Sequence, residues 1–185
     1  MRECSMLAVT ENFGGWLNIV DVSVRVAQSQ DLEAIRGIYN QGILDRIATL
    51  DAEPKSPDDM MIWWDAHRGR YGVLVAEIGH QVVGWASLNP YSSRQAYRGV
   101  AELSIYVHRE YRGQHIGQQL LTQLEILARQ HLFYKIVLFT FPHNMAGQRL
   151  YTKMGYREVG IFQRQGYLDG AFVDIMAMEK FIQTL

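Results

Sequence analysis

The sequence predicts a single mixed α/β domain, and three observations lead to this prediction. Short segments that alternate apolar and polar residues are typical of half-buried strands, whereas segments with apolar residues every three to four positions are typical of helices. These patterns follow one another in the order strand, two helices, three strands, helix, strand, helix and two strands. The chain has 185 residues, 48% of them hydrophobic and 20% charged, which suits one globular domain with a sizeable core.

The first half of the domain, which is expected to span residues 22–185, contains a strand, two helices and a hairpin. These elements are expected over residues 22–26, 31–45, 58–68, 71–78 and 81–90. Asp31 is expected to cap the first helix, in which apolar residues fall at helical spacing. Two prolines mark residues 46–57 as a loop, and the pair Gly79-His80 marks the turn of the hairpin.

The second half begins with a strand and a long amphipathic helix. Its elements are expected over residues 100–108, 116–127, 135–141, 144–154, 156–163 and 171–181. The strand after the long helix is nearly all apolar, which is typical of the centre of a sheet. Gly155 is expected to end the second helix, and a turn over residues 166–170 is expected to join the last two strands.

Charge and cysteine content exclude several kinds of partner and site. The formal net charge of −1 gives no reason to expect nucleic acid or an anionic membrane surface as a partner. Cys4 is the only cysteine, so neither an intrachain disulfide nor a thiolate metal site can form, and we expect no metal. No apolar run reaches the roughly 20 residues of a membrane-spanning helix. These features fit a cytoplasmic protein.

Residues 1–21 are expected to form an N-terminal extension outside the domain. Their apolar patch is too short for a secretory signal and is followed by polar residues and a Gly14-Gly15 pair. Two interpretations stay open: a loosely packed segment, or an arm that binds a partner through Trp16.

The most informative segment joins a strand to the long helix and reads Arg112-Gly113-Gln114-His115-Ile116-Gly117. The start of a helix presents unpaired backbone N–H groups and the positive end of the helix dipole, so it can hold a phosphate group. The two glycines allow a close approach of the backbone or a positive φ, and the arginine adds a cation. The pattern predicts either a phosphate-binding turn or an ordinary connection, and it matches neither the Walker loop nor the dinucleotide fingerprint.

Two segments resemble the cofactor motifs of the GNAT superfamily of N-acetyltransferases. YRGQHIGQQLL resembles its acetyl-CoA turn, Q/R-x-x-G-x-G/A, with Arg112 and Gly117 in place and His115 where glycine is usual. NMAGQRLYTKMGYREVG resembles its second cofactor segment, N-x-x-x-x-x-x-Y-x-x-x-G-F/Y. The resemblance implies acetyl-CoA as the cofactor. It also implies a mostly antiparallel sheet with flanking helices, splayed at its centre between the strand ending at Val107 and the strand starting at Lys135. Positive φ is uncommon for histidine, so the turn is expected to be reshaped or the cofactor bound less tightly.

The same resemblance implies a set of cofactor-binding residues on the strand end, the turn and the next helix. They are Ile105, Tyr106, Val107, Arg112, Gly113, Gln114, His115, Ile116, Gly117 and Asn144. Asn144 would bond to the pantetheine arm, cap a helix, or do both. Tyr151 occupies the position that in many members donates a proton to the leaving thiolate, with packing on an amphipathic helix as the alternative.

Three further segments resemble the phosphinothricin N-acetyltransferase branch: YNQGILDRIATLDAEP, SRQAYRGVAELSIYV and REVGIFQRQGYLDGAFVDIMAMEK. Within it, DRIATL and the LDG-x-x-x-D ending are most similar to the arsinothricin N-acetyltransferases. The resemblance covers residues 22–185. It implies that the acceptor is the amino group of a small amino-acid-like molecule of the phosphinothricin, arsinothricin or methionine sulfoximine type.

Glu102 occupies the place of this branch's catalytic glutamate, in the strand before the cofactor turn. An amine arrives as ammonium and cannot attack a thioester until it loses a proton. A carboxylate whose pKa is lifted by partial burial can remove that proton, directly or through a water. The alternative is a carboxylate on a strand face that is paired with a basic neighbour.

The loop over residues 91–99 is expected to bind the substrate. Arg94 and Tyr97 match the branch's substrate residues, and Arg98 and Arg46 are further candidates, because arginine binds carboxylates bidentately. Solvated loop charges are the alternative. Related enzymes are dimers, so we expect a homodimer in which loops from both chains line the pocket.

Three other functions remain open from the sequence. The first is acetylation of a protein N-terminus or another amine, which predicts an open, acidic or neutral groove in place of an arginine-lined pocket. The second is a non-catalytic module that binds acetyl-CoA. The third, a purely structural domain, leaves the paired cofactor motifs unexplained.

Overall fold

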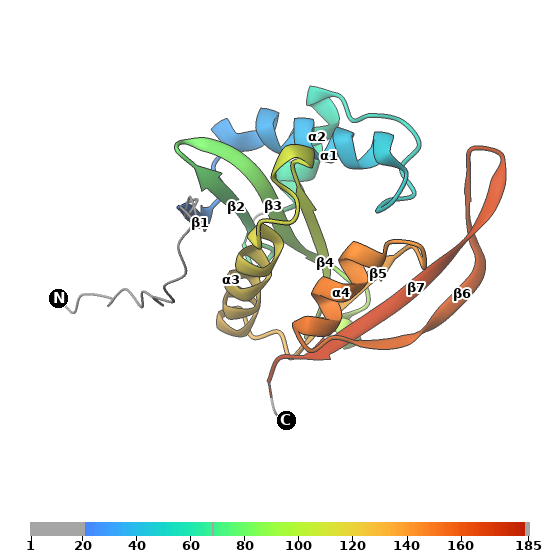
Figure 1. Ribbon diagram of the computed structural model, residues 1–185. Coiled ribbons are helices and arrows are strands. Elements are labelled where there is room, and N and C mark those ends of the chain that lie inside the picture. The colour runs from blue at the N-terminus through green and yellow to red at the C-terminus, as the bar shows by residue number, and fades with distance from the viewer. Residues whose placement is uncertain (1–20, 68, 184–185) are drawn as a thin grey trace, which may run out of the picture.

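The computed structural model describes residues 21–183 except Arg68, so the extension expected over residues 1–21 lies, apart from Asp21, outside the described part. The centre of the fold is a seven-stranded sheet in the order β1-β2-β3-β4-β5-β7-β6. Neighbouring strands are antiparallel except β4 and β5, which are parallel. Helices pack on both faces of the sheet (Figure 1). The predicted mixed α/β fold with a mostly antiparallel sheet is therefore confirmed.

The elements follow the predicted order. The strands are β1 (Val22–Val26), β2 (Val73–Ile78), β3 (Gln81–Pro90), β4 (Val100–Val107), β5 (Lys135–Thr140), β6 (Arg157–Leu168) and β7 (Ala171–Phe181). The helices are α1 (Leu32–Asp45), α2 (Pro57–Ala66), α3 (Ile116–Gln130) and α4 (Met145–Lys153), with short 3-10 turns η1 (Ser29–Asp31), η2 (Gln95–Tyr97) and η3 (Arg109–Tyr111).

Each face of the sheet has its own core. On one face, Leu120, Leu121 and Leu124 of α3 are completely buried against strands β2–β5 and β7, together with Tyr151 of α4. On the other face, α1 and α2 pack against Trp85 of β3 and its neighbours. Full burial of one aliphatic side chain stabilises a fold by about 1.5–3 kcal/mol, so the leucine stripe of α3 is enough to fix this helix on the sheet.

The splay between β4 and β5 is present where it was predicted. The two strands pair only over Val100–Glu102 and Lys135–Val137. Beyond these residues β4 continues in register with β3, and β5 continues in register with β7. The edge of β4 that faces β5 therefore lacks a strand partner from Leu103 onwards, and its main-chain groups are left to bond with something else.

Most elements begin or end a few residues away from the predicted position, and two of these differences have clear local reasons. Helix α2 was expected over residues 58–68 but covers Pro57–Ala66, because Ser56 and Asp59 form a capping box that starts it one residue earlier. Strand β6 was expected to stop near residue 163 but continues to Leu168. Asp169 and Gly170 take positive φ values of 49° and 82°, so a tight two-residue turn replaces the longer one that was expected.

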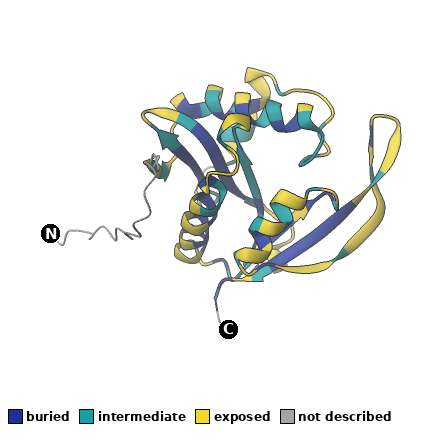
Figure 2. Ribbon diagram, in the orientation of Figure 1, coloured by how far each residue is buried: buried dark blue, intermediate teal, exposed yellow. Residues whose placement is uncertain are grey.

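The β6–β7 hairpin extends away from the helices. Figure 2 shows β6 exposed along most of its length, whereas β7 is buried at its centre. Several large apolar side chains of the hairpin are exposed: Val159, Ile161, Phe162, Tyr167 and Phe172. These five side chains are called the hairpin patch below.

Candidate active site

Two cavities meet where β4 and β5 diverge. The first, called the sheet cavity, has a volume of about 450 Å³ and is lined by α1, the loop after it, β4, β5 and the β6–β7 hairpin. The second, called the turn cavity, has a volume of about 440 Å³ and is lined by the end of β4, the turn after it and α4. Both cavities are lined by Ala48, Ile105 and Tyr106, so they adjoin along the second half of β4.

The turn cavity contains the predicted phosphate-binding turn. Gly113 has a φ of 80°, and His115 lies in the left-handed region with φ 61° and ψ 8°. His115 thus takes the conformation that glycine adopts easily, at a strain of about 1–2 kcal/mol. The main-chain amides of residues 112–117 donate no hydrogen bond to a main-chain carbonyl outside α3 in the described part of the chain. Because the first amides of a helix have no partner within it, this turn presents a set of free N–H donors.

Gly117 serves close packing and not a positive φ. It lies within the first turn of α3, where an added Cβ would be 3.0 Å from Leu150 Cδ2 of α4. The absence of a side chain therefore lets α4 approach the start of α3, and both glycine and leucine line the turn cavity.

Arg112 is fixed in place by the body of the domain. Its Nε donates to the carbonyl of Val107 at 3.1 Å, and its Nη2 is 2.7 Å from Asp45 Oδ2. Arg109 forms a second ion pair with Asp45, at 2.6 Å, and these two arginines hold the pKa of this carboxyl below its ordinary value against the effect of burial. The C-terminal end of α1 is thereby tied to the turn.

Helix α4 adds two cations that the sequence analysis missed. Arg149 and Lys153 are exposed, four residues apart, and both line the turn cavity. Their spacing places them on one face of a helix, a signal that was readable from the sequence. Asn144 lines the same cavity and caps α4: its Oδ1 accepts from the amide of Gly147 at 3.0 Å, and its Nδ2 donates to Thr140 Oγ1 at 3.0 Å.

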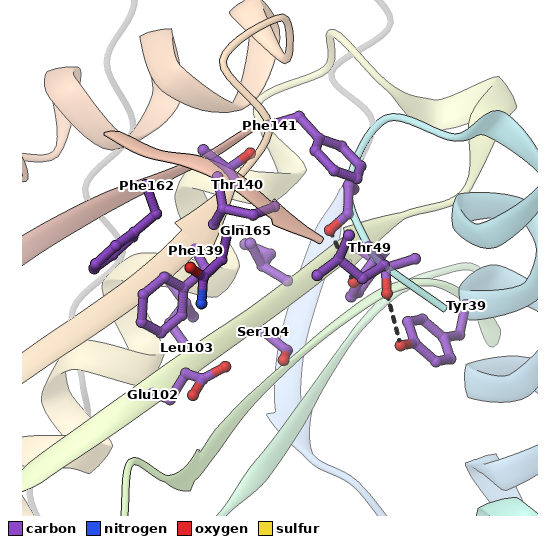
Figure 3. A pocket seen from close by; sticks show the side chains of 15 residues that line it. Tyr39, Thr49, Glu102, Leu103, Ser104, Phe139, Thr140, Phe141, Phe162 and Gln165 are labelled. Atoms are coloured by element: carbon purple, nitrogen blue, oxygen red, sulfur yellow. Dashed lines mark hydrogen bonds between the residues drawn. The ribbon is translucent and has the colours of Figure 1, made fainter. Parts of the chain in front are cut away.

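Glu102 lies in the wall of the sheet cavity, at the last residue pair that joins β4 to β5. On this strand Leu103 belongs to the α3 core, whereas Tyr106 contacts Tyr39 of α1, so the even-numbered residues share the α1 face. Figure 3 shows Glu102 and Ser104 projecting from β4 into this cavity.

The Glu102 carboxyl is half-buried, and among the described residues no hydrogen bond or ion pair to it is present. Burial without a compensating cation raises the pKa of Glu102 above its ordinary value. A carboxylate with a raised pKa is a stronger proton acceptor near neutral pH than an exposed one. The alternative of a glutamate paired with a basic neighbour therefore does not apply within the described chain.

Aromatic and hydroxyl groups complete the sheet cavity. Tyr39 Oη donates to Asp51 at 2.5 Å and lies 3.2 Å from Thr49 Oγ1, and burial followed by the Asp51 carboxylate raises the pKa of Tyr39 to about 12. Phe139 and Phe162 face each other across β5 and β6 with ring centroids 6.5 Å apart. The sequence analysis missed these residues, and only the position of Ser104, two residues after Glu102, was readable from the period of the strand.

Other predicted site residues lie outside both cavities in this chain. Arg94, Tyr97 and Arg98 are exposed on the loop before β4 and line neither cavity. Gln114 is also exposed and does not line the turn cavity. Arg46 contacts main-chain carbonyls of its own loop and pairs with Asp169 of the hairpin turn at 2.8 Å. The roles of these residues in binding stay predictions.

Tyr151 lies in the core, not in the lining of either cavity. Its side chain is 8% exposed, packs 6.0 Å from the ring of Tyr156, and has its pKa raised by burial. The role of proton donor to a thiolate stays a prediction, which Tyr151→Phe tests directly.

Metal ligands and membrane segments were sought over the described residues. Between residues 21 and 183, Arg68 apart, no group of three His, Cys, Asp or Glu side chains is arranged to hold a metal ion. Over the same part of the chain, no helix has the length and apolar character required to cross a bilayer.

Known proteins match most of the chain. The acetyltransferase (GNAT) family matches residues 39–156. YwnH of Bacillus subtilis is 34% identical over 160 residues, a match that covers 86% of this chain and 98% of that protein. The L-methionine sulfoximine/L-methionine sulfone acetyltransferase of Salmonella typhimurium is 29% identical over 159 residues, covering 85% of this chain and 93% of that protein. The crystal structure of a phosphinothricin acetyltransferase from Sinorhizobium meliloti in complex with acetyl-CoA has a TM-score of 0.82 at 27% identity, covering 86% of this chain and 88% of that one.

Proposed function

The chain belongs to the acetyltransferase (GNAT) family and uses acetyl-CoA, and on that premise we propose that it acetylates the amino group of a small amino-acid-like molecule. One observation carries the proposal: the predicted phosphate-binding turn lines one cavity, Glu102 lines the other, and the two cavities adjoin at Ile105 and Tyr106. A donor thioester and an acceptor amine can therefore meet beside β4.

The turn cavity fits acetyl-CoA in the chemistry of its donors. The free amides of residues 113–117, with Arg112 and Arg149, would hold the diphosphate. The unpaired edge of β4 after Leu103 would bond the amides of the pantetheine arm, beside the capping residue Asn144. When bound, acetyl-CoA supplies an activated thioester whose acetyl group passes to the amine.

Glu102 is proposed as the general base. Its carboxylate would accept a proton from the acceptor's ammonium group, directly or through one water, and leave the neutral amine facing Ile105 and Tyr106. The pKa raised by burial supports this role, because a carboxylate of higher pKa is a stronger acceptor for the proton of an ammonium group, whose own pKa is higher still.

The class of acceptor is proposed from relatives. The Salmonella protein acts on methionine sulfoximine and sulfone, and the Sinorhizobium protein is a phosphinothricin acetyltransferase. Such amino acids carry a carboxylate and a polar or anionic side chain. The predicted substrate residues Arg94 and Arg98 would supply the matching cations.

Because those arginines do not line the sheet cavity of their own chain, we propose that a homodimer completes the site. The side chains of the hairpin patch are exposed and apolar, and one of them, Phe162, lines this cavity. A second copy of the chain seated on the hairpin patch would cover it and bring further loops to the cavity mouth.

Phe172→Asp places a charge in the patch, so this variant is expected to sediment as a monomer and the wild type as a dimer in sedimentation velocity. A wild-type protein that sediments as a monomer would contradict the proposal.

One observation favours a second candidate function. No arginine or lysine lines the sheet cavity in the described chain, and a neutral groove was the feature expected of an enzyme that acetylates peptide N-termini. The two candidate functions, acetylation of an amino acid and acetylation of a peptide N-terminus, differ in whether the acceptor must carry a free α-carboxylate.

The test is thiol release from acetyl-CoA with a panel of acceptors: L-phosphinothricin, L-methionine sulfone, L-methionine sulfoximine, simple amino acids and short peptides with free N-termini. We expect the first three to give the highest kcat/KM. Turnover of peptides alone would establish the second candidate, and no turnover of any amine by a protein that binds acetyl-CoA would overturn both.

Arg94→Ala tests whether the loop over residues 91–99 contributes to binding of the acceptor and not to the chemical step. We expect a raised KM for the acceptor with a smaller change in kcat, because binding of a remote anion is lost equally in ground and transition states. Unchanged values of both constants would remove this loop from substrate binding.

A further inference from the structure

Behind the wall of the sheet cavity, side chains from three elements form a row of hydrogen bonds. His67 follows α2, Asn89 lies on β3 and Ser104 lies on β4. His67 Nε2 is 2.7 Å from Asn89 Oδ1, and Asn89 Nδ2 donates to Ser104 Oγ at 3.0 Å. The hydroxyl of Ser87, a buried neighbour on β3, donates to the same Oδ1 at 3.1 Å. Ser104 is the member of this row that lines the sheet cavity.

The orientation of the Asn89 amide is fixed by its partners. The main-chain carbonyl of Glu102 lies 3.3 Å from Nδ2 and can only accept, so the NH2 group must face β4 and the carbonyl must face His67. Both amide hydrogens and both carbonyl lone pairs are then used. In this orientation both imidazole nitrogens of His67 donate, Nε2 to Asn89 and Nδ1 to the main-chain carbonyl of Trp63 at 2.6 Å. Turning the amide over would set Oδ1 against the Glu102 carbonyl, an acceptor facing an acceptor, whereas the serine hydroxyls and the imidazole could exchange roles, so the Glu102 carbonyl is the partner that keeps Nδ2 directed at β4.

This arrangement decides what the Ser104 hydroxyl can do. A serine oxygen that accepts a hydrogen bond keeps its own hydrogen for another partner. Among the described residues, the hydroxyl of Ser104 has no hydrogen bond other than the one from Asn89. The Ser104 O–H is therefore free to bond a ligand on the face of β4 that it shares with Glu102, where Ser104 lines the sheet cavity and also a cavity beside α2 (Figure 3).

We propose that Asn89, held by His67, is a positioning residue that turns Ser104 into a hydrogen-bond donor for the carboxylate of the acceptor amino acid. Residues two apart on a strand face are separated by about 6.6 Å. The N–Cα–C unit of an amino acid spans about 2.5 Å. With one hydrogen bond of about 2.8 Å at each end the reach is about 8 Å, so the molecule can bridge the two side chains when the bonds are inclined to the strand. An amino acid with its ammonium on Glu102 thus places its carboxylate at Ser104, which orients the amine for attack.

This inference rests on the proposed function, and a double-mutant cycle tests it. The variants are Ser104→Ala, Asn89→Ala and both together, assayed with L-methionine sulfone or L-phosphinothricin, whichever the wild type acetylates better. We expect Ser104→Ala to lower kcat/KM for the acceptor about ten- to a hundred-fold, the range for a lost bond to a charged group, mainly through KM. Asn89→Ala should lose a large part of the same factor. The double variant should be no worse than Ser104→Ala, since both remove one interaction.

A second acceptor identifies the group that Ser104 binds. The amine 3-methylsulfonylpropylamine is methionine sulfone without its carboxylate, and Ser104→Ala should turn it over at the wild-type rate. Ser104→Thr keeps a hydroxyl and should retain most of the activity with the amino acid. The matched control is Ser87→Ala, which removes a buried hydroxyl bonded to the same amide but not part of the cavity lining, and should lose less activity than Ser104→Ala.

The outcomes separate this inference from the proposed function. Equal losses with and without the carboxylate, or additive losses in the double variant, would overturn the role of Asn89 and Ser104 while leaving acetyl transfer intact. A wild-type protein without turnover of any amine would instead remove the proposed function. Thermal unfolding of each variant identifies losses of activity that come from misfolding. If Ser104→Ala does not fold, Asn89→Ala and Ser104→Thr still test whether the Ser104 hydroxyl binds the carboxylate.

Discussion

Glu102→Gln gives the sharpest test of the chemistry, because the structure predicts opposite effects on rate and on stability. The amide has nearly the shape of the carboxyl, and in the described chain the Glu102 side chain has no hydrogen bond to lose. What the substitution removes is a charge in a half-buried position, which is also the proposed proton acceptor.

The expected loss in kcat is about 10²- to 10⁴-fold, the usual contribution of a general base. This range corresponds to about 2.7–5.5 kcal/mol of barrier at 1.36 kcal/mol per decade. The free energy of unfolding should move the other way. Because burial raises the pKa of Glu102, the folded state binds the proton more tightly than the unfolded state does. The wild type therefore loses stability as the pH rises from the unfolded pKa of about 4.3 through the higher folded value, and the glutamine variant does not.

The assay is thiol release at saturating acetyl-CoA over about pH 5 to 9, with kcat/KM for the acceptor as the readout. Wild-type activity should rise with pH as Glu102 ionises, and Glu102→Gln should lack this limb while keeping the affinity for acetyl-CoA. Urea unfolding at neutral pH should find the variant at least as stable as the wild type. An unchanged rate and pH profile would refute the assignment of Glu102 as base.

Three further predictions follow from particular contacts. Gly117→Val places a side chain against Leu150, 3.0 Å from the new Cβ, so α3 and α4 must separate. We expect the free energy of unfolding to fall by about 1–3 kcal/mol and the KM for acetyl-CoA to rise; a variant with wild-type KM would refute the role of this packing in cofactor binding. Arg149→Ala should raise the Kd of coenzyme A about two- to five-fold at low salt and less at high salt, measured by calorimetry, as for an exposed charge pair. Arg25→Ala leaves the buried Asp31 without its 2.7 Å partner, which should lower the free energy of unfolding by about 1–3 kcal/mol at pH 7. Since Arg25 and the Gln28 amide hold the pKa of Asp31 below its ordinary value, the stability from these contacts is present above pH ~3.9 and is lost as the pH falls through the folded pKa, a dependence that should be weaker in the variant.

Much of the fold was predictable because each element carries its own periodicity. The order of elements, the hairpin at Gly79-His80 and the place of the splay follow from local pattern and from the family resemblance, whereas the short parallel pairing before the splay was not predicted. The hairpin turn was expected to begin at Gly166, although the pair Asp169-Gly170 is itself typical of a two-residue turn and takes that conformation here. The left-handed backbone of His115 depends on the turn around it, so residue type alone did not predict it.

The candidate site was predictable only where it lies on one element. Glu102 and the turn after β4 are set by strand alternation and by a contiguous motif. Asn89 meets His67 because α2 docks against β3, and no sequence spacing encodes that contact at 2.7 Å. The position of Arg94 relative to the cavity depends on the path of an exposed loop and on neighbours outside the single chain, so residue type alone could not fix it.

The brevity of the β4–β5 junction has a consequence for how the molecule responds to its coenzyme. Three residue pairs join two otherwise continuous half-sheets, so a ligand lodged in the gap acts as an extra tie between them. Ligand at a hundred times its Kd adds about 2.7 kcal/mol to the free energy of unfolding. Amide hydrogens on the second half of β4 should then exchange with solvent far more slowly, which makes deuterium uptake there a gauge of occupancy that is independent of turnover.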